Sequence, residues 1–296
     1  MFSLDFLLKG VAAPAGAACV VALLLRRICS GTRGIGAVAY AAGQLLGTAW
    51  MLSGSGEWLP SRNLQWVPWV GVAAAMIGPT VVATGLATIE RWLLTFLASV
   101  AAAVVLVPQW PDLWPPRWLS VALFALAATV VARLLDGLIR RSSPRVIALL
   151  MASGSIVAAM LIAVSLSLSV AEAALTTSAA LMGTAVAMSF RSDEQAVRGL
   201  CLPYTLAVGG WCYVSAIESP PPAPPLVGLL FLPAAPLVIW FTAVGPVSRC
   251  STRRRLIVDV LLWMTTAAAI SAWVWFGTEG GDEEYARLTR TWHTIT

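Results

Sequence analysis

"RVIALLMASGSIVAAMLIAVSLSLSVAEAALTTSAALMGTAVAMSFR" (residues 145–191) is the stretch that decides the fold, because its 45 interior residues contain one charged side chain, Glu172. A helix needs about 20 mostly apolar residues to cross the hydrocarbon core of a bilayer. The segment is therefore long enough for two spanning helices and a tight turn, which we expect near residues 167–169. It predicts a helical hairpin inside a membrane.

Glu172 follows this expected turn and so falls in the first turn of the second helix of the hairpin. The sequence Ser169-Val170-Ala171-Glu172 fits the capping box, in which serine and glutamate accept hydrogen bonds from free N–H groups at a helix start. An acid there also faces the positive end of the helix dipole. We interpret Ser169 and Glu172 as a helix cap at the outer interface; the alternative is a ligand-binding role in an outer vestibule.

The composition extends the membrane prediction to the whole chain. Of 296 residues, 59% are hydrophobic and 11% are charged, whereas soluble domains carry about 25% charged residues. So few charges cannot cover a water-soluble protein of this size, so lipid must solvate much of the surface. We predict an all-α polytopic bundle of about ten spans, as a single unit over residues 1–276. The spans are 4–25, 34–53, 66–88, 92–108, 118–138, 146–167, 170–190, 199–217, 226–246 and 256–276.

The distribution of arginines predicts the orientation, because basic residues are retained on the cytoplasmic side. Alternate connections hold thirteen arginines: Arg26, Arg27, Arg33, Arg91, Arg140, Arg141, Arg145, Arg191, Arg198, Arg249, Arg253, Arg254 and Arg255. The opposite connections and the tail hold four: Arg62, Arg117, Arg287 and Arg290. The sequence therefore predicts a multi-pass protein of a bacterial-type inner membrane with both termini on the outer side.

The tail at 277–296 is the one polar segment with a recognisable pattern. Glu283 and Arg287 are spaced for an ion pair along a helix, and apolar residues fall on one face, which suits a short interfacial helix. The outer connections 109–118 and 218–225 are rich in proline and are expected to form stiff hairpins. We expect the lipid bilayer as the main partner, with the hairpins and tail as candidate surfaces for other membrane proteins. No basic face suited to nucleic acid is present.

The chain lacks the residue patterns of enzymes and metalloproteins. Its five cysteines form no C-x-x-C pair and it has one histidine, His293, so a zinc or haem site is not expected. Nucleophile-elbow, zinc-protease, phosphate-loop and dinucleotide motifs are missing as well. We predict a protein that is not an enzyme and uses no cofactor or metal.

Two acid–arginine combinations lie near the cytoplasmic ends of spans. Asp136 follows Arg133 by three residues in span five, and Asp259 follows Arg255 by four in span ten. Both spacings favour ion pairs along a helix. The structural interpretation is a pair of interfacial salt bridges, and the functional one is an inner gate or a proton site.

Small residues recur every fourth position in three spans, which allows close packing of helix backbones. The seams are Ala39-Gly43-Gly47, Ser155-Ala159-Ala163-Ser167 and Ala179-Gly183-Ala187. They predict a compact internal bundle.

Helix breakers near the expected bilayer centre suggest a route for a solute. Span three carries Gly78-Pro79, span eight carries Gly209-Gly210, and span nine carries Pro233 and Pro236. If ten spans form an inverted repeat of five plus five, spans three and eight correspond, and carriers often bind substrate at such paired breaks. The alternative is a simple kink with glycine packing. Gln44, in the middle of span two, either lines the same path or bonds a neighbouring helix.

These features lead to two functional hypotheses. The first is a permease or carrier for a small neutral or weakly polar solute, with its path near Gln44, Gly78, Pro79, Gly209 and Gly210. The second is a non-catalytic membrane subunit or scaffold. A carrier requires a cavity with polar groups near the middle of the bilayer, whereas a scaffold requires solid packing and an exposed small-residue face.

Overall fold

The computed structural model describes residues 3–28, 34–55, 60, 62–82, 85–110, 113, 115–165, 168–190, 194–218, 224–244 and 252–293. Every secondary-structure element in these ranges is helical, which confirms the all-α prediction. The elements are α1 (Leu4–Phe6), the π-helix η1 (Leu7–Ala12), α2 (Ala13–Ile28), α3 (Ile35–Ser55), α4 (Asn63–Val82), α5 (Thr88–Leu106), α6 (Arg117–Ile139), α7 (Pro144–Ser165), α8 (Leu168–Phe190), α9 (Glu194–Arg198), α10 (Cys201–Glu218), the 3₁₀ helix η2 (Pro224–Ile239), α11 (Trp240–Val244) and α12 (Thr252–His293).

Nine helices in the described ranges are long and apolar enough to cross a bilayer. The tenth predicted span, 226–246, corresponds to the 3₁₀ helix η2 and the short α11, whose apolar part is the shorter Gly228–Val244. Pro233 and Pro236 lie inside η2. Proline lacks an N–H donor and its ring clashes with the preceding helical turn. Two prolines only three residues apart thus disfavour a regular α-helix here, whereas α4 stays α-helical with its two prolines eleven residues apart, Pro68 and Pro79.

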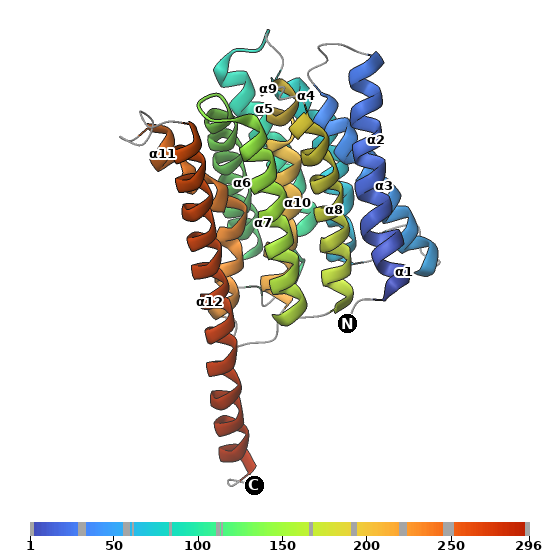
Figure 1. Ribbon diagram of the computed structural model, residues 1–296. Coiled ribbons are helices and arrows are strands. Elements are labelled where there is room, and N and C mark those ends of the chain that lie inside the picture. The colour runs from blue at the N-terminus through green and yellow to red at the C-terminus, as the bar shows by residue number, and fades with distance from the viewer. Residues whose placement is uncertain are drawn as a thin grey trace.

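The long helices stand side by side as one bundle (Figure 1). The hairpin predicted between Arg145 and Arg191 forms: α7 ends at Ser165 and α8 begins at Leu168. α1 and the C-terminal end of α12 lie at the same end of the bundle. Large apolar side chains cover its outside, such as Phe241 at 75% exposure and Trp118 at 71%. Such a surface is stable in lipid and costly in water.

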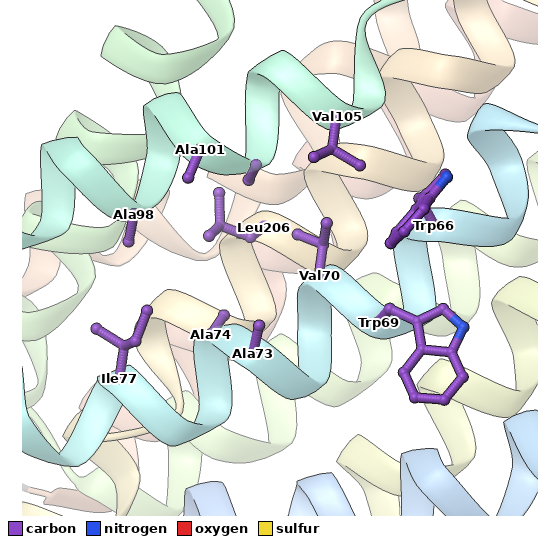
Figure 2. Close-up of a pocket in the computed structure, with 11 residues that line it drawn as sticks. Trp66, Trp69, Val70, Ala73, Ala74, Ile77, Ala98, Ala101, Val105 and Leu206 are labelled. Atoms are coloured by element: carbon purple, nitrogen blue, oxygen red, sulfur yellow. The ribbon is translucent and has the colours of Figure 1, made fainter. Parts of the chain in front are cut away.

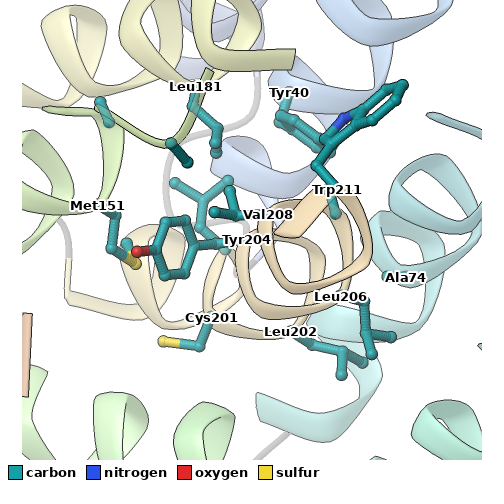
Figure 3. Close-up of a cluster of buried hydrophobic side chains, with 14 of the residues drawn as sticks. Tyr40, Ala74, Met151, Leu181, Cys201, Leu202, Tyr204, Leu206, Val208 and Trp211 are labelled. Carbon is teal, nitrogen blue, oxygen red and sulfur yellow. The ribbon is translucent and has the colours of Figure 1, made fainter. Parts of the chain in front are cut away.

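α10 is the central helix of the bundle and packs against α4, α5, α6, α7, α8 and η2. Figure 3 shows its side chains pointing outward in several directions among those of the surrounding helices. Tyr204 and Trp211 of α10 are almost completely buried. The indole nitrogen of Trp211 donates a hydrogen bond to the Thr177 hydroxyl of α8 at 3.0 Å. This bond satisfies a polar group that would be expensive to bury alone.

The seams of small residues in α3 and α8 lie where these two helices and α2 all contact one another. A β-carbon added to Gly43 would lie 2.6 Å from the Pro14 carbonyl oxygen, and one added to Gly183 would lie 2.0 Å from the Ala15 carbonyl oxygen. Both contacts are with backbone atoms of α2. The glycines therefore allow α2, α3 and α8 to approach each other closely, as small residues do in membrane bundles.

The C-terminal segment differs from its prediction. A separate short helix was expected within 277–296, but α12 continues as one helix from Thr252 to His293. It projects beyond the lower end of the bundle in Figure 1. At 1.5 Å per residue its 42 residues extend for about 63 Å, roughly twice the thickness of the hydrocarbon core.

Candidate functional site

The five residues of the predicted solute path lie in different parts of the bundle. Gln44 of α3 is 1% exposed, and its side-chain nitrogen donates a hydrogen bond to Thr48 Oγ1 at 3.3 Å. Its side-chain oxygen is buried and has no hydrogen-bond partner among the described residues. Gln44 thus forms a contact along its own helix with one polar atom unsatisfied.

The prediction that spans three and eight are interrupted near their middle is wrong. α4 is continuous through Gly78 and Pro79, and α10 is continuous through Gly209 and Gly210. Both glycine positions serve close packing: the Gly199 carbonyl oxygen lies against Gly78, and Leu106 and Val67 lie against Gly210.

The contacts of these glycines show that they lie at different levels of the same helix pair. A β-carbon on Gly78 would lie 2.3 Å from the Gly199 carbonyl oxygen, and one on Gly210 would lie 3.1 Å from Val67 of α4. Val67 and Gly78 are eleven residues apart on α4, which corresponds to about 16 Å along the helix axis. Gly78 and Gly210 therefore do not form one site at a common depth.

Gly209, in contrast, lines a cavity of about 440 Å³ between α6, α10 and η2. Its other walls are mostly apolar, and three hydroxyl side chains line it, one from α6 and two from α10: Ser120, Thr205 and Tyr213. No charged residue is present among its lining residues. The volume falls within the usual range for small-molecule sites, which are apolar with a few placed polar groups.

The polar groups of this cavity are held by local contacts. Ser120 donates a hydrogen bond to the Pro115 carbonyl oxygen at 2.9 Å, and Thr205 donates to the Cys201 carbonyl oxygen at 2.8 Å. Each of these hydroxyl oxygens keeps lone pairs that can accept a bond from a ligand. The Tyr213 hydroxyl lies beside Ser120, and its ring packs edge-on against Phe124 at 5.1 Å. The cavity can therefore hold an apolar molecule with one or two hydrogen-bonding groups.

The irregular backbone of η2 forms one side of this cavity through Leu230 and Pro233. A 3₁₀ helix is tighter and longer per residue than an α-helix, and its side chains stack in three rows. Consequently η2 does not interdigitate with α6 and α10 as a regular helix would. The cavity lies where this mismatch occurs.

A second cavity, of about 310 Å³, lies between α4 and α5 with Leu206 of α10 at its floor. Figure 2 shows alanines from both helices along it and the indole rings of Trp66 and Trp69 at one end. All of its lining residues are apolar or aromatic. It is a groove suited to hydrocarbon.

A cluster of charged side chains, called the ion cluster below, lies where α6 meets α9, at the end of the bundle that holds the α6–α7 turn. The carboxylate of Asp136 is 2.5 Å from Arg198 Nε, 3.2 Å from Arg140 Nη2 and 3.4 Å from Arg133 Nη1. The Asp136 and Arg133 side chains are both more than 90% buried. The predicted Arg133–Asp136 pair is thus present, within a larger network that connects two helices.

The second predicted pair, Arg255 with Asp259, is wrong. Arg255 instead donates hydrogen bonds to the Arg141 carbonyl oxygen at 3.2 Å and to Ser142 Oγ at 2.9 Å, both in the α6–α7 turn. Asp259 is 4% exposed and accepts a hydrogen bond from the Thr242 hydroxyl of α11. Contacts between helices replace the i,i+4 pair, because each side chain finds a partner on a neighbouring element.

The partners that sequence reasoning missed are Arg198, Glu194 and Thr242. Arg198 lies 62 residues from Asp136, and its side chain also contacts Glu194 at 3.5 Å. The sequence does place Arg198 just before a spanning helix, on the same predicted side of the membrane as Asp136. This position predicts that the two residues lie at a similar depth, but it does not predict that they form an ion pair.

The remaining predicted residues are Ser169 and Glu172. α8 begins at Leu168, so Ser169 is its second residue and Glu172 its fifth, and the first turn of α8 contains no acidic residue. The predicted place of Glu172 in the first turn is therefore wrong. The hydrogen bonds of a capping box between them stay a prediction. Within the described ranges, no group of three or more His, Cys, Asp or Glu side chains is arranged to hold a metal ion.

Comparison of the chain with protein families, with curated protein sequences and with solved structures gives no significant match. The fold itself defines the class: the chain is a multi-pass integral membrane protein. Two features of the structure bear on its function: the cavity between α6, α10 and η2, and the ion cluster of Asp136.

Proposed function

We propose that this protein is a permease or carrier for a small neutral or weakly polar solute. The observation that carries the proposal is the 440 Å³ cavity between α6, α10 and η2, with its three hydroxyl groups and uncharged walls. A charged solute would lose its hydration there without an opposite charge to replace it. A largely apolar solute with one or two hydrogen-bonding groups matches the lining.

The exposure of the lining residues supports entry of the solute from the bilayer. Leu123 is 52% exposed and Leu230 is 41% exposed, and both line the cavity from opposite walls, α6 and η2. Ser120 and Val131, both lining residues, are eleven positions apart on α6, so the cavity extends for about 16 Å along that helix. A solute dissolved in the membrane can thus enter between α6 and η2. The Ser120 and Tyr213 hydroxyls are almost completely buried, so a solute that bonds them must move the side chains that cover them.

The ion network of Asp136 supports a closed inner end. Arg198 and Asp136 join α9 to α6 beyond Val131, the last residue of α6 that lines the cavity, toward the α6–α7 turn, and separating a buried ion pair is costly. We assign this network the role of the inner gate, which opens when a transported solute changes the packing of α6. With the predicted orientation, the protein acts in the inner membrane with both termini outside, and without catalysis or a cofactor.

The test is a cavity-filling substitution, Gly209→Leu. A β-carbon at Gly209 has only ordinary contacts, 3.8 Å from Pro233 and 3.9 Å from Phe124, so the added side chain occupies the cavity and leaves the backbone in place. The purified chain, in detergent and then in lipid vesicles, is screened with small neutral solutes by thermal shift and by uptake. Solutes that stabilise and enter with the wild type are expected to do neither with Gly209→Leu.

Gly16→Ala is the matched control, because no atom lies within 4 Å of a β-carbon at that position. It is expected to retain both binding and uptake. Equal uptake by the wild type and Gly209→Leu would contradict the proposal, as would a wild type that neither binds nor moves any solute of this class.

The second candidate, a non-catalytic membrane subunit, is favoured by the extension of α12 beyond the bundle. A helix that continues outside the membrane provides a surface for a second protein. Gentle extraction of the tagged chain from its own membrane distinguishes the two: a partner of constant stoichiometry, lost on removal of 277–296, would favour the subunit.

A further inference from the structure

The groove between α4 and α5 is long and narrow. Trp66 and Ile77 of α4 both line it, and their separation of eleven residues corresponds to about 16 Å along the helix axis. That length is about half of the hydrocarbon core, which is roughly 30 Å thick, so the groove is as deep as one leaflet of the bilayer. Its volume of about 310 Å³, spread over this length, gives a mean cross-section of about 20 Å².

Alanines leave the space between the two helices. Two from α4 and three from α5 line the groove (Figure 2): Ala73, Ala74, Ala98, Ala101 and Ala102. Ala73 and Ala101, on opposite walls, are exposed, so the groove is open to the lipid around the bundle. Apolar walls that face an empty space lose their dispersion contacts. Hydrocarbon from the bilayer is the material that restores them.

The narrow cross-section indicates which occupant fits. A helix with its side chains is about 10 Å across, so a partner helix or a second copy of the chain is too wide to enter the groove. A single hydrocarbon chain keeps only about 4 Å to the atoms it touches and fits lengthwise. All lining residues are apolar or aromatic, which suits a chain without polar groups.

The end of the groove at the start of α4 offers polar contacts. Trp66 is 38% exposed, and its indole nitrogen points away from the labelled alanines in Figure 2. An indole ring at a bilayer interface turns its N–H toward the polar headgroups. Arg62, one turn before Trp66, is exposed as well, and a guanidinium group suits a lipid phosphate.

We propose that the α4–α5 groove binds one acyl chain of a phospholipid, with the phosphate of the same lipid at Arg62 and Trp66. Dispersion contacts along the alanines hold the chain, and a charge-assisted hydrogen bond holds the headgroup. The groove shares no lining residue with the cavity between α6, α10 and η2. The lipid site therefore stands or falls independently of the proposed transport function.

The experiment counts phospholipid molecules bound to the full chain by native mass spectrometry. The chain is purified in a mild detergent and titrated with palmitoyl-oleoyl phosphatidylglycerol, a phospholipid with an acidic headgroup. We expect one lipid molecule to bind at a lower concentration than all others and to stay bound when the detergent is removed. The same lipid is expected to raise the unfolding temperature until the site is saturated, because it binds the native state.

The double variant Ala73→Leu/Ala101→Leu fills the groove from both walls at positions that are exposed. It is expected to lose the tightly bound lipid, and each single variant is expected to weaken its binding even if the double variant does not fold. Ala122→Leu is the matched control, because Ala122 is exposed on α6 and lines neither the groove nor the solute cavity. It is expected to keep the lipid.

Arg62→Gln tests the headgroup contact. The loss of an exposed ion pair is expected to weaken the apparent lipid affinity about two- to fivefold. Arg145→Gln is its control, because Arg145 is exposed at the start of α7, at the α6–α7 turn, and it is expected to leave the affinity unchanged.

Equal lipid binding by the wild type and the filled variant would overturn the proposal. Loss of a second copy of the chain from the filled variant, in place of a lipid, would also overturn it, because the groove would then belong to an interface between copies. Unchanged affinity in Arg62→Gln would contradict the phosphate contact.

Discussion

Two regions on either side of α10 are built from similar residues and packed in opposite ways. In the close-packed region, formed by α2, α3 and α8, β-carbons added to Gly47 and Gly183 would each lie 2.0 Å from a neighbouring atom. In the cavity region, formed by α6, α10 and η2, a β-carbon added to Gly209 would find its nearest neighbour at 3.8 Å. Glycine content alone thus does not determine how closely membrane helices approach.

The difference arises from the backbone of the third element in each region. α2, α3 and α8 are regular where they meet, so their small residues face one another at helical spacing. η2 is a 3₁₀ helix with Pro233 and Pro236 inside it, and its side chains do not fit the grooves of α6 and α10. The space that a solute could occupy therefore borders this irregular element, with Pro233 among its lining residues.

Removal of the Asp136 charge is the change with the largest expected effect, because this buried carboxylate contacts the guanidinium groups of three arginines. Asp136→Asn leaves Arg133 and Arg198 buried without their shared partner, which is expected to cost about 3–5 kcal/mol in stability. Unfolding of the purified chain in detergent, by heat or denaturant, measures the loss. Asp259→Asn is the control, since Asp259 is equally buried but its partner is the Thr242 hydroxyl, from which an amide oxygen can also accept. Equal losses in the two variants would show that burial, and not the arginines, sets the cost.

The close-packed region is tested by Gly183→Ala. The new methyl group would overlap the backbone of α2 at Ala15, which cannot rotate away as a flexible side chain can. Overpacking of this kind typically costs about 1–3 kcal/mol, and we expect a value at the upper end. The same unfolding measurement applies, and a neutral result would mean that α2 and α8 are free to separate.

These two regions also show what the sequence could and could not predict. Nine of the ten spans, the α7–α8 hairpin and the small-residue seams of α3 and α8 were predictable, because hydropathy and spacing along one helix are local properties. The seam at Gly43 and Gly183 fulfils its prediction of close packing. The solute path did not follow from the same reasoning: Gly78 and Gly210 lie at different depths, although both are glycines near the middle of a span.

The failures have a common physical reason, which is that partners on different helices leave no periodic signal. Arg255 was predicted to pair with Asp259 four residues away, yet it bonds Ser142 of the α6–α7 turn. Arg198 is separated from Asp136 by 62 residues, and nothing in the sequence joins them. The sequence shows the two prolines of η2, but it does not show which helices pack beside η2, and the position of the cavity depends on that packing.

Glycine-to-alanine substitutions at open positions are expected to have the smallest effect, and they are expected to raise stability where the other variants lower it. Alanine is favoured over glycine inside a helix by about 0.5–1 kcal/mol, a gain that appears only where the methyl group fits. Gly209→Ala meets ordinary van der Waals contacts at 3.8 Å and Gly16→Ala meets nothing within 4 Å, so both are expected to raise stability slightly. Thermal unfolding of the two variants beside Gly183→Ala gives the test. If Gly209→Ala destabilised the chain while Gly16→Ala stabilised it, α6, α10 and η2 would be closer together than the cavity implies, and the space for a solute would be lost.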